Sequence, residues 1–173
     1  MKSLLIGVIA LVGLAFSGPM LAAEDNGSKG ISYYKKKNDL EMVYVRHRKK
    51  PLNEVYNSIF TALENNGYFV VFEPNIGKNM ALFEERWGKD YNKNKLEAIR
   101  SMVFCNAWYA NQVSNADPQM LALCPLHISL VHKEGVTRIL FIRPSLVATG
   151  SAAEKVALEL EQDVIRTIES GLR

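Results

Sequence analysis

Hydrophobic and polar residues alternate along residues 39–48, and this period of two is typical of a strand with one apolar face. The same alternation recurs over residues 126–132, where the following Glu134-Gly135 turn indicates a hairpin with the next strand. Residues 68–72 are a continuous β-rich run that stops before Pro74. The predicted strands are residues 39–48, 68–72, 98–104, 126–132 and 137–142.

Helical spacing of apolar residues predicts helices between and after these strands. The first runs from Leu52 to Gly67, a glycine suited to a left-handed cap. The second carries a Met-and-aromatic stripe with spacings of 4, 3 and 4 residues. Other helix starts are expected at Asn106 and at Asp117-Pro118. Residues 151–154 form a capping box before the last helix, which runs nearly to the C-terminus.

The predicted order is strand, helix, strand, helix, strand, helix, hairpin, helix. Strands and helices are mixed, but the hairpin implies antiparallel pairing. We therefore expect an α+β domain with helices packed against one sheet. A chain of 173 residues is expected to hold a single domain.

The first 23 residues are predicted to be a secretory signal peptide, residues 1–23. Lys2 precedes an apolar run from Leu4 to Phe16, and small residues end at Ala23. An uncleaved anchor is the alternative, but the run is shorter than the roughly 20 residues of a membrane span. Residues 24–38 are read as a flexible leader and residues 39–173 as the domain. We expect a periplasmic or secreted protein without membrane insertion after cleavage.

Composition narrows the class of protein further. Hydrophobic residues make up 48% and charged residues 23%, which is ordinary for a globular protein. The formal net charge of +3 does not argue for a nucleic-acid partner. A basic cluster at Arg46, Arg48, Lys49 and Lys50 is either a solvated strand end or a docking patch for an acidic protein partner.

Cys105 and Cys124 are the most reactive side chains among the candidate residues, and each adjoins the end of a predicted strand. In an oxidising compartment they predict a structural disulfide. They are alternatively a redox or sulfur-carrying pair, with Cys105 attacking and Cys124 resolving. A third reading adds His127 as a soft metal ligand for copper or zinc, or a haem site. No motif or carboxylate pair assigns a catalytic residue.

A ligand pocket is the other candidate site. The stripe of Met80, Phe83 and Trp87 is adaptable and apolar, although such a stripe more often packs in a core. Trp108 and Tyr109 flank the Cys105-Asn106 segment and either line a pocket or pack a helix onto the sheet. The predicted pocket candidates are Trp87, Met80, Phe83, Trp108, Tyr109 and Asn106.

Several local motifs together resemble one known family, the domain of unknown function 302. The resemblance covers roughly residues 39–171. It rests on Asn66-Gly67-Tyr68, Phe104-Cys105-Asn106-Ala107, Asp117-Pro118, Leu123-Cys124-Pro125, Glu134-Gly135 and Arg143-Pro144-Ser145.

The resemblance implies a fold similar to half of the TATA-binding protein, a curved antiparallel sheet with helices packed on one face, in the order β-α-β-α-β-α-β-β-α. It also implies a homodimer and a link to sulfur or respiratory metabolism, and it carries over no catalytic residue. Some relatives have Cys-Pro-Cys where this chain has Cys124-Pro125-Leu126, which argues against a three-cysteine site here.

Three functions are compatible with these observations. We favour a secreted binding or accessory protein that holds a small apolar or sulfur ligand between sheet and helices, near the cysteine pair. The first alternative is a thiol redox or sulfur-transfer component, and the second is a structural partner-docking subunit. The missing motifs argue against an enzyme without excluding one.

Overall fold

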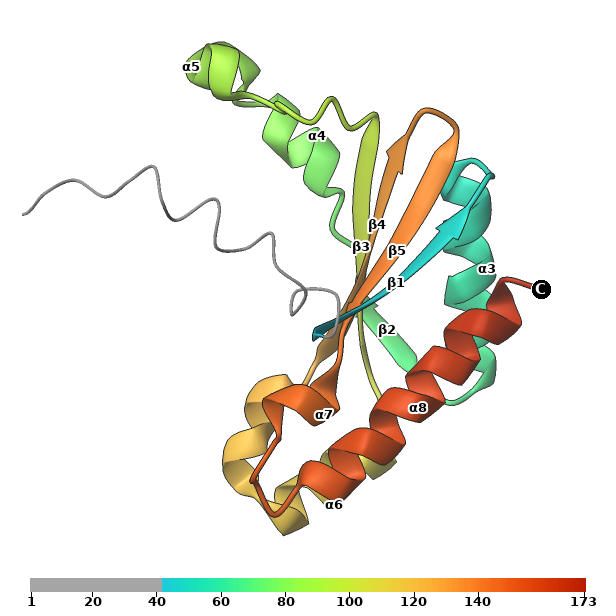
Figure 1. Cartoon of the computed structure of the whole chain (residues 1–173), viewed down its shortest axis with the longest axis vertical. Coiled ribbons are helices and arrows are strands. Elements are labelled where there is room, and N and C mark those ends of the chain that lie inside the picture. The colour runs from blue at the N-terminus through green and yellow to red at the C-terminus, as the bar shows by residue number, and fades with distance from the viewer. Residues whose placement is uncertain (1–41) are drawn as a thin grey trace, which may run out of the picture. The chain divides into compact units, whose positions relative to one another are not determined.

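Five strands form one antiparallel sheet in the order β1-β5-β4-β3-β2. The computed structural model describes residues 42–173, so the predicted signal peptide and leader lie outside the described residues (Figure 1). The hairpin predicted at Glu134-Gly135 is present as β4 and β5. The strands are β1 (Val43–Arg48), β2 (Phe69–Phe72), β3 (Ala98–Cys105), β4 (Leu126–Lys133) and β5 (Val136–Ile142).

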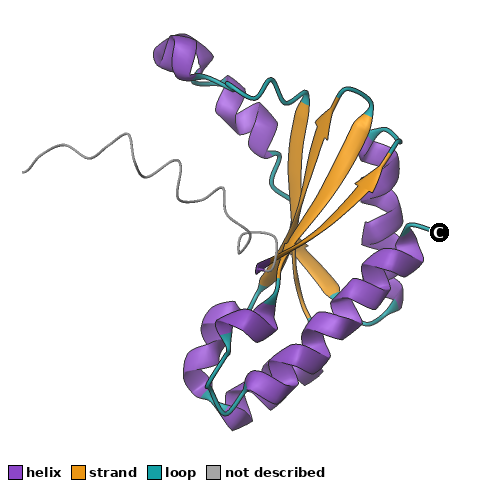
Figure 2. Cartoon of the chain, viewed as in Figure 1, coloured by secondary structure: helices purple, strands orange, loops and turns teal. Residues whose placement is uncertain are grey.

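Two long helices, α3 (Leu52–Asn65) and α8 (Glu154–Gly171), lie side by side against one face of this sheet (Figures 1 and 2). The α+β class and the antiparallel sheet predicted from the sequence are therefore confirmed. The remaining helices are short: α4 (Ile76–Ala81), α5 (Glu84–Trp87), η1 (Gly88–Asp90), α6 (Ala107–Ala116), η2 (Pro118–Leu123) and α7 (Pro144–Val147).

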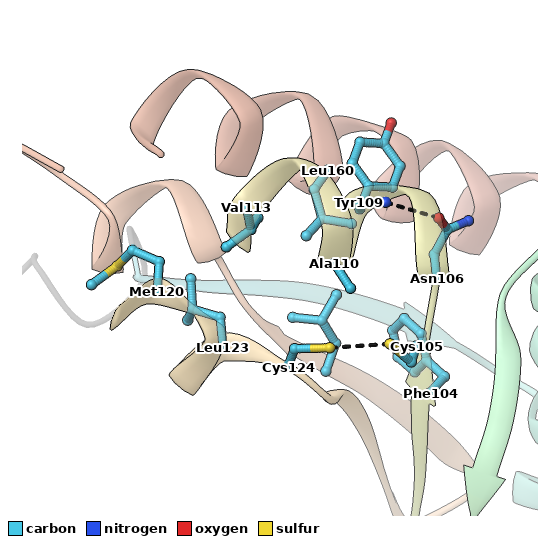
Figure 3. A pocket seen from close by; sticks show the side chains of 11 residues that line it. Phe104, Cys105, Asn106, Tyr109, Ala110, Val113, Met120, Leu123, Cys124 and Leu160 are labelled. Carbon is cyan, nitrogen blue, oxygen red and sulfur yellow. Dashed lines mark hydrogen bonds between the residues drawn. The ribbon is translucent and has the colours of Figure 1, made fainter. Parts of the chain in front are cut away.

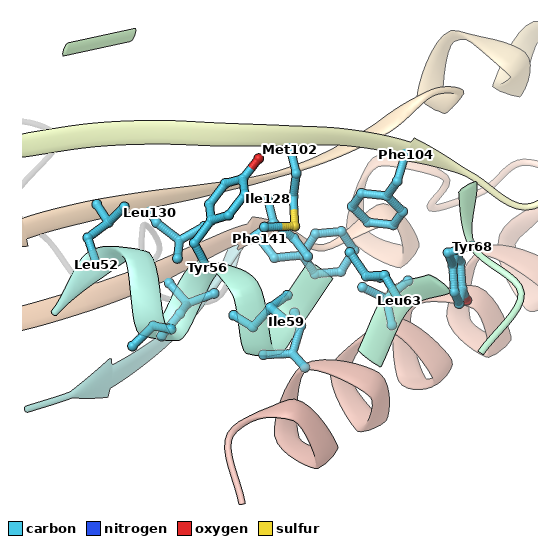
Figure 4. Close-up of a cluster of buried hydrophobic side chains, with 14 of the residues drawn as sticks. Leu52, Tyr56, Ile59, Leu63, Tyr68, Met102, Phe104, Ile128, Leu130 and Phe141 are labelled. Carbon is cyan, nitrogen blue, oxygen red and sulfur yellow. The ribbon is translucent and has the colours of Figure 1, made fainter. Parts of the chain in front are cut away.

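The core lies between the sheet and these two long helices (Figure 4). Alternate residues of β3, β4 and β5 point into it, and the apolar stripes of α3 and α8 cover them. Burying each such side chain stabilises the fold by about 1.5–3 kcal/mol. The central fully buried residues are Ile59, Leu63, Met102, Phe104, Ile128, Leu130, Ile139, Phe141, Val164 and Ile168.

The predicted helix over Ile76 to Trp87 is broken into α4 and α5, and neither contains a buried residue. α4 lies beside β3 instead of on the core face of the sheet, and just before it the Ser101 amide donates to the Pro74 carbonyl, whereas α5 contacts η1. Beside β3 only part of the stripe finds a surface to pack on. Correct helical spacing therefore did not place this stripe in the core.

The capping box predicted at residues 151–154 is wrong, because α8 begins at Glu154 with Ala153 as its N-cap and no side-chain capping hydrogen bond. The Glu154 carboxylate accepts from the Gly150 amide at 2.8 Å, and Ser151 Oγ accepts from the Ala153 amide at 3.0 Å. Ser151 Oγ also donates to Asp117 Oδ2 at 2.6 Å, and Asp117 caps η2 through the Gln119 amide. These bonds join the start of η2, beside the cysteine region, to the start of α8.

Candidate functional site

The structure brings Cys105 and Cys124 together (Figure 3). Cys105 is the last residue of β3, and Cys124 directly follows η2. The antiparallel pairing of β3 and β4 sets Phe104 opposite Leu126, so the end of one strand faces the entry of the other. The two sulfur atoms lie 3.0 Å apart as free thiols, and both residues are half-buried.

The surroundings of the Cys124 thiol change its acidity. Burial, together with the hydrogen bond and charge of Cys105, raises the pKa of Cys124 to about 11. Cys124 therefore keeps its proton at neutral pH and can donate it to the Cys105 sulfur. A thiol that keeps its proton is a poor first nucleophile, so Cys124 suits the resolving role better than the attacking one.

A narrow apolar cavity opens beside the pair, with a volume of about 20 Å³ (Figure 3). That volume accommodates roughly one water molecule, because a single water needs about 10–15 Å³ of cavity. The cavity as it stands is thus too small for an organic ligand. Its apolar walls include Phe104, Tyr109, Val113, Met120, Leu123 and Leu160.

Asn106 supports the cysteine segment from the start of α6. Its side-chain oxygen accepts from the Tyr109 amide at 3.1 Å, and its amide nitrogen donates to the Gly67 carbonyl at 3.0 Å. The first bond caps α6, and the second ties the end of β3 to the turn between α3 and β2. Asn106 and Tyr109 both line the cysteine cavity, so two of the predicted pocket residues lie beside the thiols.

The other predicted pocket residues lie elsewhere. Phe83 and Trp87 stack on one another with ring centroids 5.2 Å apart, and both are more than 40% exposed. Trp108 is 64% exposed. Met80 lines a different cavity, between α4 and β3. The structure therefore does not gather the six candidates into one pocket.

His127 is exposed and lies on the sheet face opposite the core. Within residues 42–173, no group of three or more His, Cys, Asp or Glu side chains is placed to hold a metal ion. The structure thus does not join His127 to Cys105 and Cys124. In the same part of the chain, no helix is both long and apolar enough to cross a membrane.

The basic cluster after β1 is largely engaged with nearby carboxylates. Arg46 and Arg48 lie 2.7 and 3.9 Å from the carboxylate of Glu169, which also accepts from the Tyr44 hydroxyl. Burial alone would raise the pKa of Glu169, but hydrogen bonds from Tyr44 and Arg46 lower it overall. Lys50 pairs with Glu54. The positive charge available to an acidic partner is correspondingly reduced.

The sequence reasoning missed the larger cavity, which has a volume of about 410 Å³ between α4, the start of α3 and the edge of β3. Arg100 lines it. The available signal was an arginine inside a largely apolar strand, two residues from the core position Met102. A buried-strand arginine needs polar partners, so its position invites a search for them.

Comparisons with known proteins support the fold and the family. The chain is similar to a solved structure described as an uncharacterized conserved protein DUF302 from Bacillus stearothermophilus. The TM-score is 0.64 at 16% sequence identity, covering 75% of this chain and 97% of the other. No curated protein matches this chain significantly. The model of the domain of unknown function DUF302 matches residues 43–171, and the chain therefore belongs to that family.

Proposed function

We propose that Cys105 and Cys124 form a reversible dithiol–disulfide couple, and that the protein is a thiol redox or sulfur-transfer component. The contact of 3.0 Å between the two sulfur atoms carries this proposal. It takes precedence over a ligand held beside the thiols, because the cavity there is only about 20 Å³.

The chemistry is thiol–disulfide exchange with a disulfide substrate. The Cys105 thiolate attacks one substrate sulfur, forms a mixed disulfide and releases the other substrate sulfur as a thiolate. Cys124 then loses its proton and attacks Cys105, which releases the second substrate thiolate and closes the Cys105–Cys124 disulfide. Two electrons pass to the substrate, and the two thiol protons balance its two new thiols.

A structural disulfide is the competing explanation, and the reduction potential distinguishes the two. Catalytic couples lie at about −120 to −270 mV, whereas structural disulfides lie below about −300 mV. The purified mature protein is equilibrated in glutathione and dithiothreitol buffers, and its oxidised fraction is measured by intact mass. We expect the reduction potential of the Cys105–Cys124 couple to lie between about −120 and −270 mV. A potential below about −300 mV would assign the pair to fold stability.

Trapping of the mixed disulfide tests whether Cys105 attacks and Cys124 resolves. Cys124→Ser leaves the attacking sulfur without its resolving partner, so it should accumulate a mixed disulfide with oxidised glutathione. Cys105→Ser is the matched control, because the remaining thiol has its pKa raised by burial. The chain has only two cysteines, so each variant carries one thiol. Equal trapping by both variants would contradict the roles.

The second candidate is the binding or accessory function favoured from the sequence. The cavity of about 410 Å³ supports it, because small-molecule sites commonly span about 300–1,000 Å³. We propose for both candidates a periplasmic or secreted location, which N-terminal sequencing after periplasmic expression tests. A chain that retains residues 1–23 would oppose it.

A homodimer is also proposed, supported by the exposed apolar side chains of β2. Phe69, Val71 and Phe72 are each more than 60% exposed on this edge strand. A second copy would cover them, and light scattering of the mature protein should give twice the chain mass. A monomer at micromolar concentration would oppose the dimer, and salt-sensitive capture of an acidic protein would favour the docking alternative.

A further inference from the structure

We propose that the cavity between α4 and β3 binds a small organic acid, with its carboxylate on the guanidinium of Arg100 and its apolar body against α4. This inference rests on the ligand-binding candidate and names its ligand class. It does not depend on the cysteine couple, because the lining residues of the two cavities do not overlap.

The guanidinium of Arg100 is held in place by Tyr56 but has few close hydrogen-bond acceptors. Its guanidinium carbon lies 3.7 Å from the centroid of the Tyr56 ring, which is buried. Its terminal nitrogens make only long contacts, 3.4 Å to Asn53 Oδ1 and 3.8 Å to Glu73 Oε2. Its Nε is buried without a hydrogen-bond partner. A guanidinium stacked on one face and short of acceptors is suited to a carboxylate, which it binds bidentately.

Other polar groups around the cavity offer donors. Asn53 Oδ1 is taken by Arg100 and Asn75 Oδ1 by the Lys78 amide, so both side chains have amide N–H groups left to donate. Lys78 adds a cation at the exposed rim. An excess of donors favours an anionic ligand over a neutral or cationic one.

The acidic groups nearby are already engaged. Glu97, the one acid among the described residues that line the cavity, accepts from the Glu134 amide at 2.9 Å and lies 3.7 Å from His132 Nε2. Glu73 accepts from the Tyr56 hydroxyl at 2.6 Å. Glu73 offsets part of the charge of Arg100, but at 3.8 Å it leaves the guanidinium edge short of a direct hydrogen bond.

Apolar side chains complete the cavity and set the kind of acid. Leu52, Met80, Leu96 and Ile99 contribute aliphatic surface, and Met adapts readily to irregular ligands. A volume of about 410 Å³ exceeds what a single inorganic ion needs. The combination fits a carboxylate with a short aliphatic chain.

The experiment titrates the full mature protein with hexanoate, using 1-hexanol and hexylammonium as neutral and cationic probes. Binding is followed by calorimetry and by the NMR chemical shifts of the backbone amides of Ile99 and Arg100. We expect hexanoate to bind at least about tenfold more tightly than hexanol, which corresponds to about 1.4 kcal/mol. Hexylammonium should not bind measurably.

Substitutions test whether Arg100 and the open cavity are needed for hexanoate binding. Arg100→Gln should weaken hexanoate binding about tenfold or more, whereas the matched control Arg138→Gln, at an exposed position of β5, should not. If Arg100→Gln does not fold, Ala81→Phe at an exposed lining position narrows the cavity without removing the guanidinium, and should also weaken binding.

These measurements distinguish a preference for anions from ligand binding in general. Equal binding of hexanoate and hexanol, or full binding by folded Arg100→Gln, would overturn the anion inference and leave the ligand-binding candidate standing. If no probe binds or shifts the amides of Ile99 and Arg100, the anion inference falls and this cavity no longer supports the ligand-binding candidate.

Discussion

Glu161 is a buried charge on α8, and its removal should destabilise the fold more than any surface substitution. The residue is 1% exposed. Its Oε1 accepts from Arg143 Nε at 2.7 Å, and its Oε2 accepts from the Ser145 amide at 3.1 Å and from the Ser145 hydroxyl. The carboxylate thus joins α8 to the first turn of α7.

The expected loss follows from what the carboxylate satisfies. Breaking a buried ion pair by removing one partner costs about 3–5 kcal/mol. The Arg143 side chain is 35% exposed and keeps access to water, so we expect the lower end of that range for Glu161→Ala, about 3 kcal/mol. Glu161→Gln keeps the volume but replaces one acceptor oxygen by an NH2 group that faces a donor, so its cost should be about 2 kcal/mol.

Urea unfolding followed by circular dichroism measures both variants. For a chain of this size, about 3 kcal/mol corresponds to a fall in Tm of roughly 6–12 °C. The matched control is Glu159→Gln on the same helix, whose side chain is 57% exposed and 4.0 Å from Lys155. It should stay within about 0.5 kcal/mol of wild type. A loss below about 1 kcal/mol for Glu161→Ala would show that the buried ion pair contributes little to stability.

Three further predictions concern other parts of the described structure. Because hydrogen bonds lower the pKa of Glu169, its stabilisation should be present above the ordinary glutamate pKa of 4.5 and disappear as the pH falls through the lowered value. The difference in unfolding free energy between wild type and Glu169→Gln should therefore shrink below that pH, and a constant difference down to pH 2 would contradict it. The raised pKa of Cys124 predicts that, in the reduced protein, its alkylation rate keeps rising with pH up to about 11, and a plateau near pH 9 in peptide-resolved mass spectrometry would count against this. Gly171→Ala places a Cβ 2.8 Å from the Ser58 carbonyl oxygen, so crowding between α3 and α8 should cost about 1–3 kcal/mol in urea unfolding; an unchanged midpoint would show that the helices separate freely.

Local patterns were enough to predict the strands, the hairpin and the two long helices. Periodicity reports which side of an element is apolar, and α3 and α8 bury those sides. The same reasoning was wrong about the single helix over Ile76 to Trp87, because periodicity does not say whether a surface is available to receive the stripe. The helix starts predicted at Asn106 and Asp117 were correct, since both side chains cap their helices. The capping box predicted at residues 151–154 was wrong, because Ser151 binds the Ala153 amide and Asp117 instead of capping α8.

For the candidate site, the sequence singled out the two cysteines at the ends of predicted strands as a disulfide or a redox pair. The structure makes β3 and β4 neighbours and places the sulfur atoms 3.0 Å apart. Sequence reasoning could not divide the aromatic candidates between a thiol cavity, an exposed stacked pair and a separate cavity. That division depends on where α4, α5 and α6 lie relative to the sheet.

The α+β class, the main order of strands and helices and the reactive side chains follow from the chain alone, because short-range periodicity and turn chemistry act over a few neighbouring positions. Three contacts depend on tertiary packing instead: Arg100 stacks on Tyr56 beside an open cavity, Glu161 bonds to Ser145 at the start of α7, and Glu169 engages Arg46 and Arg48. Each of these contacts joins residues far apart in the chain. Their energies depend on burial and distance, which exist only once the sheet and helices have packed.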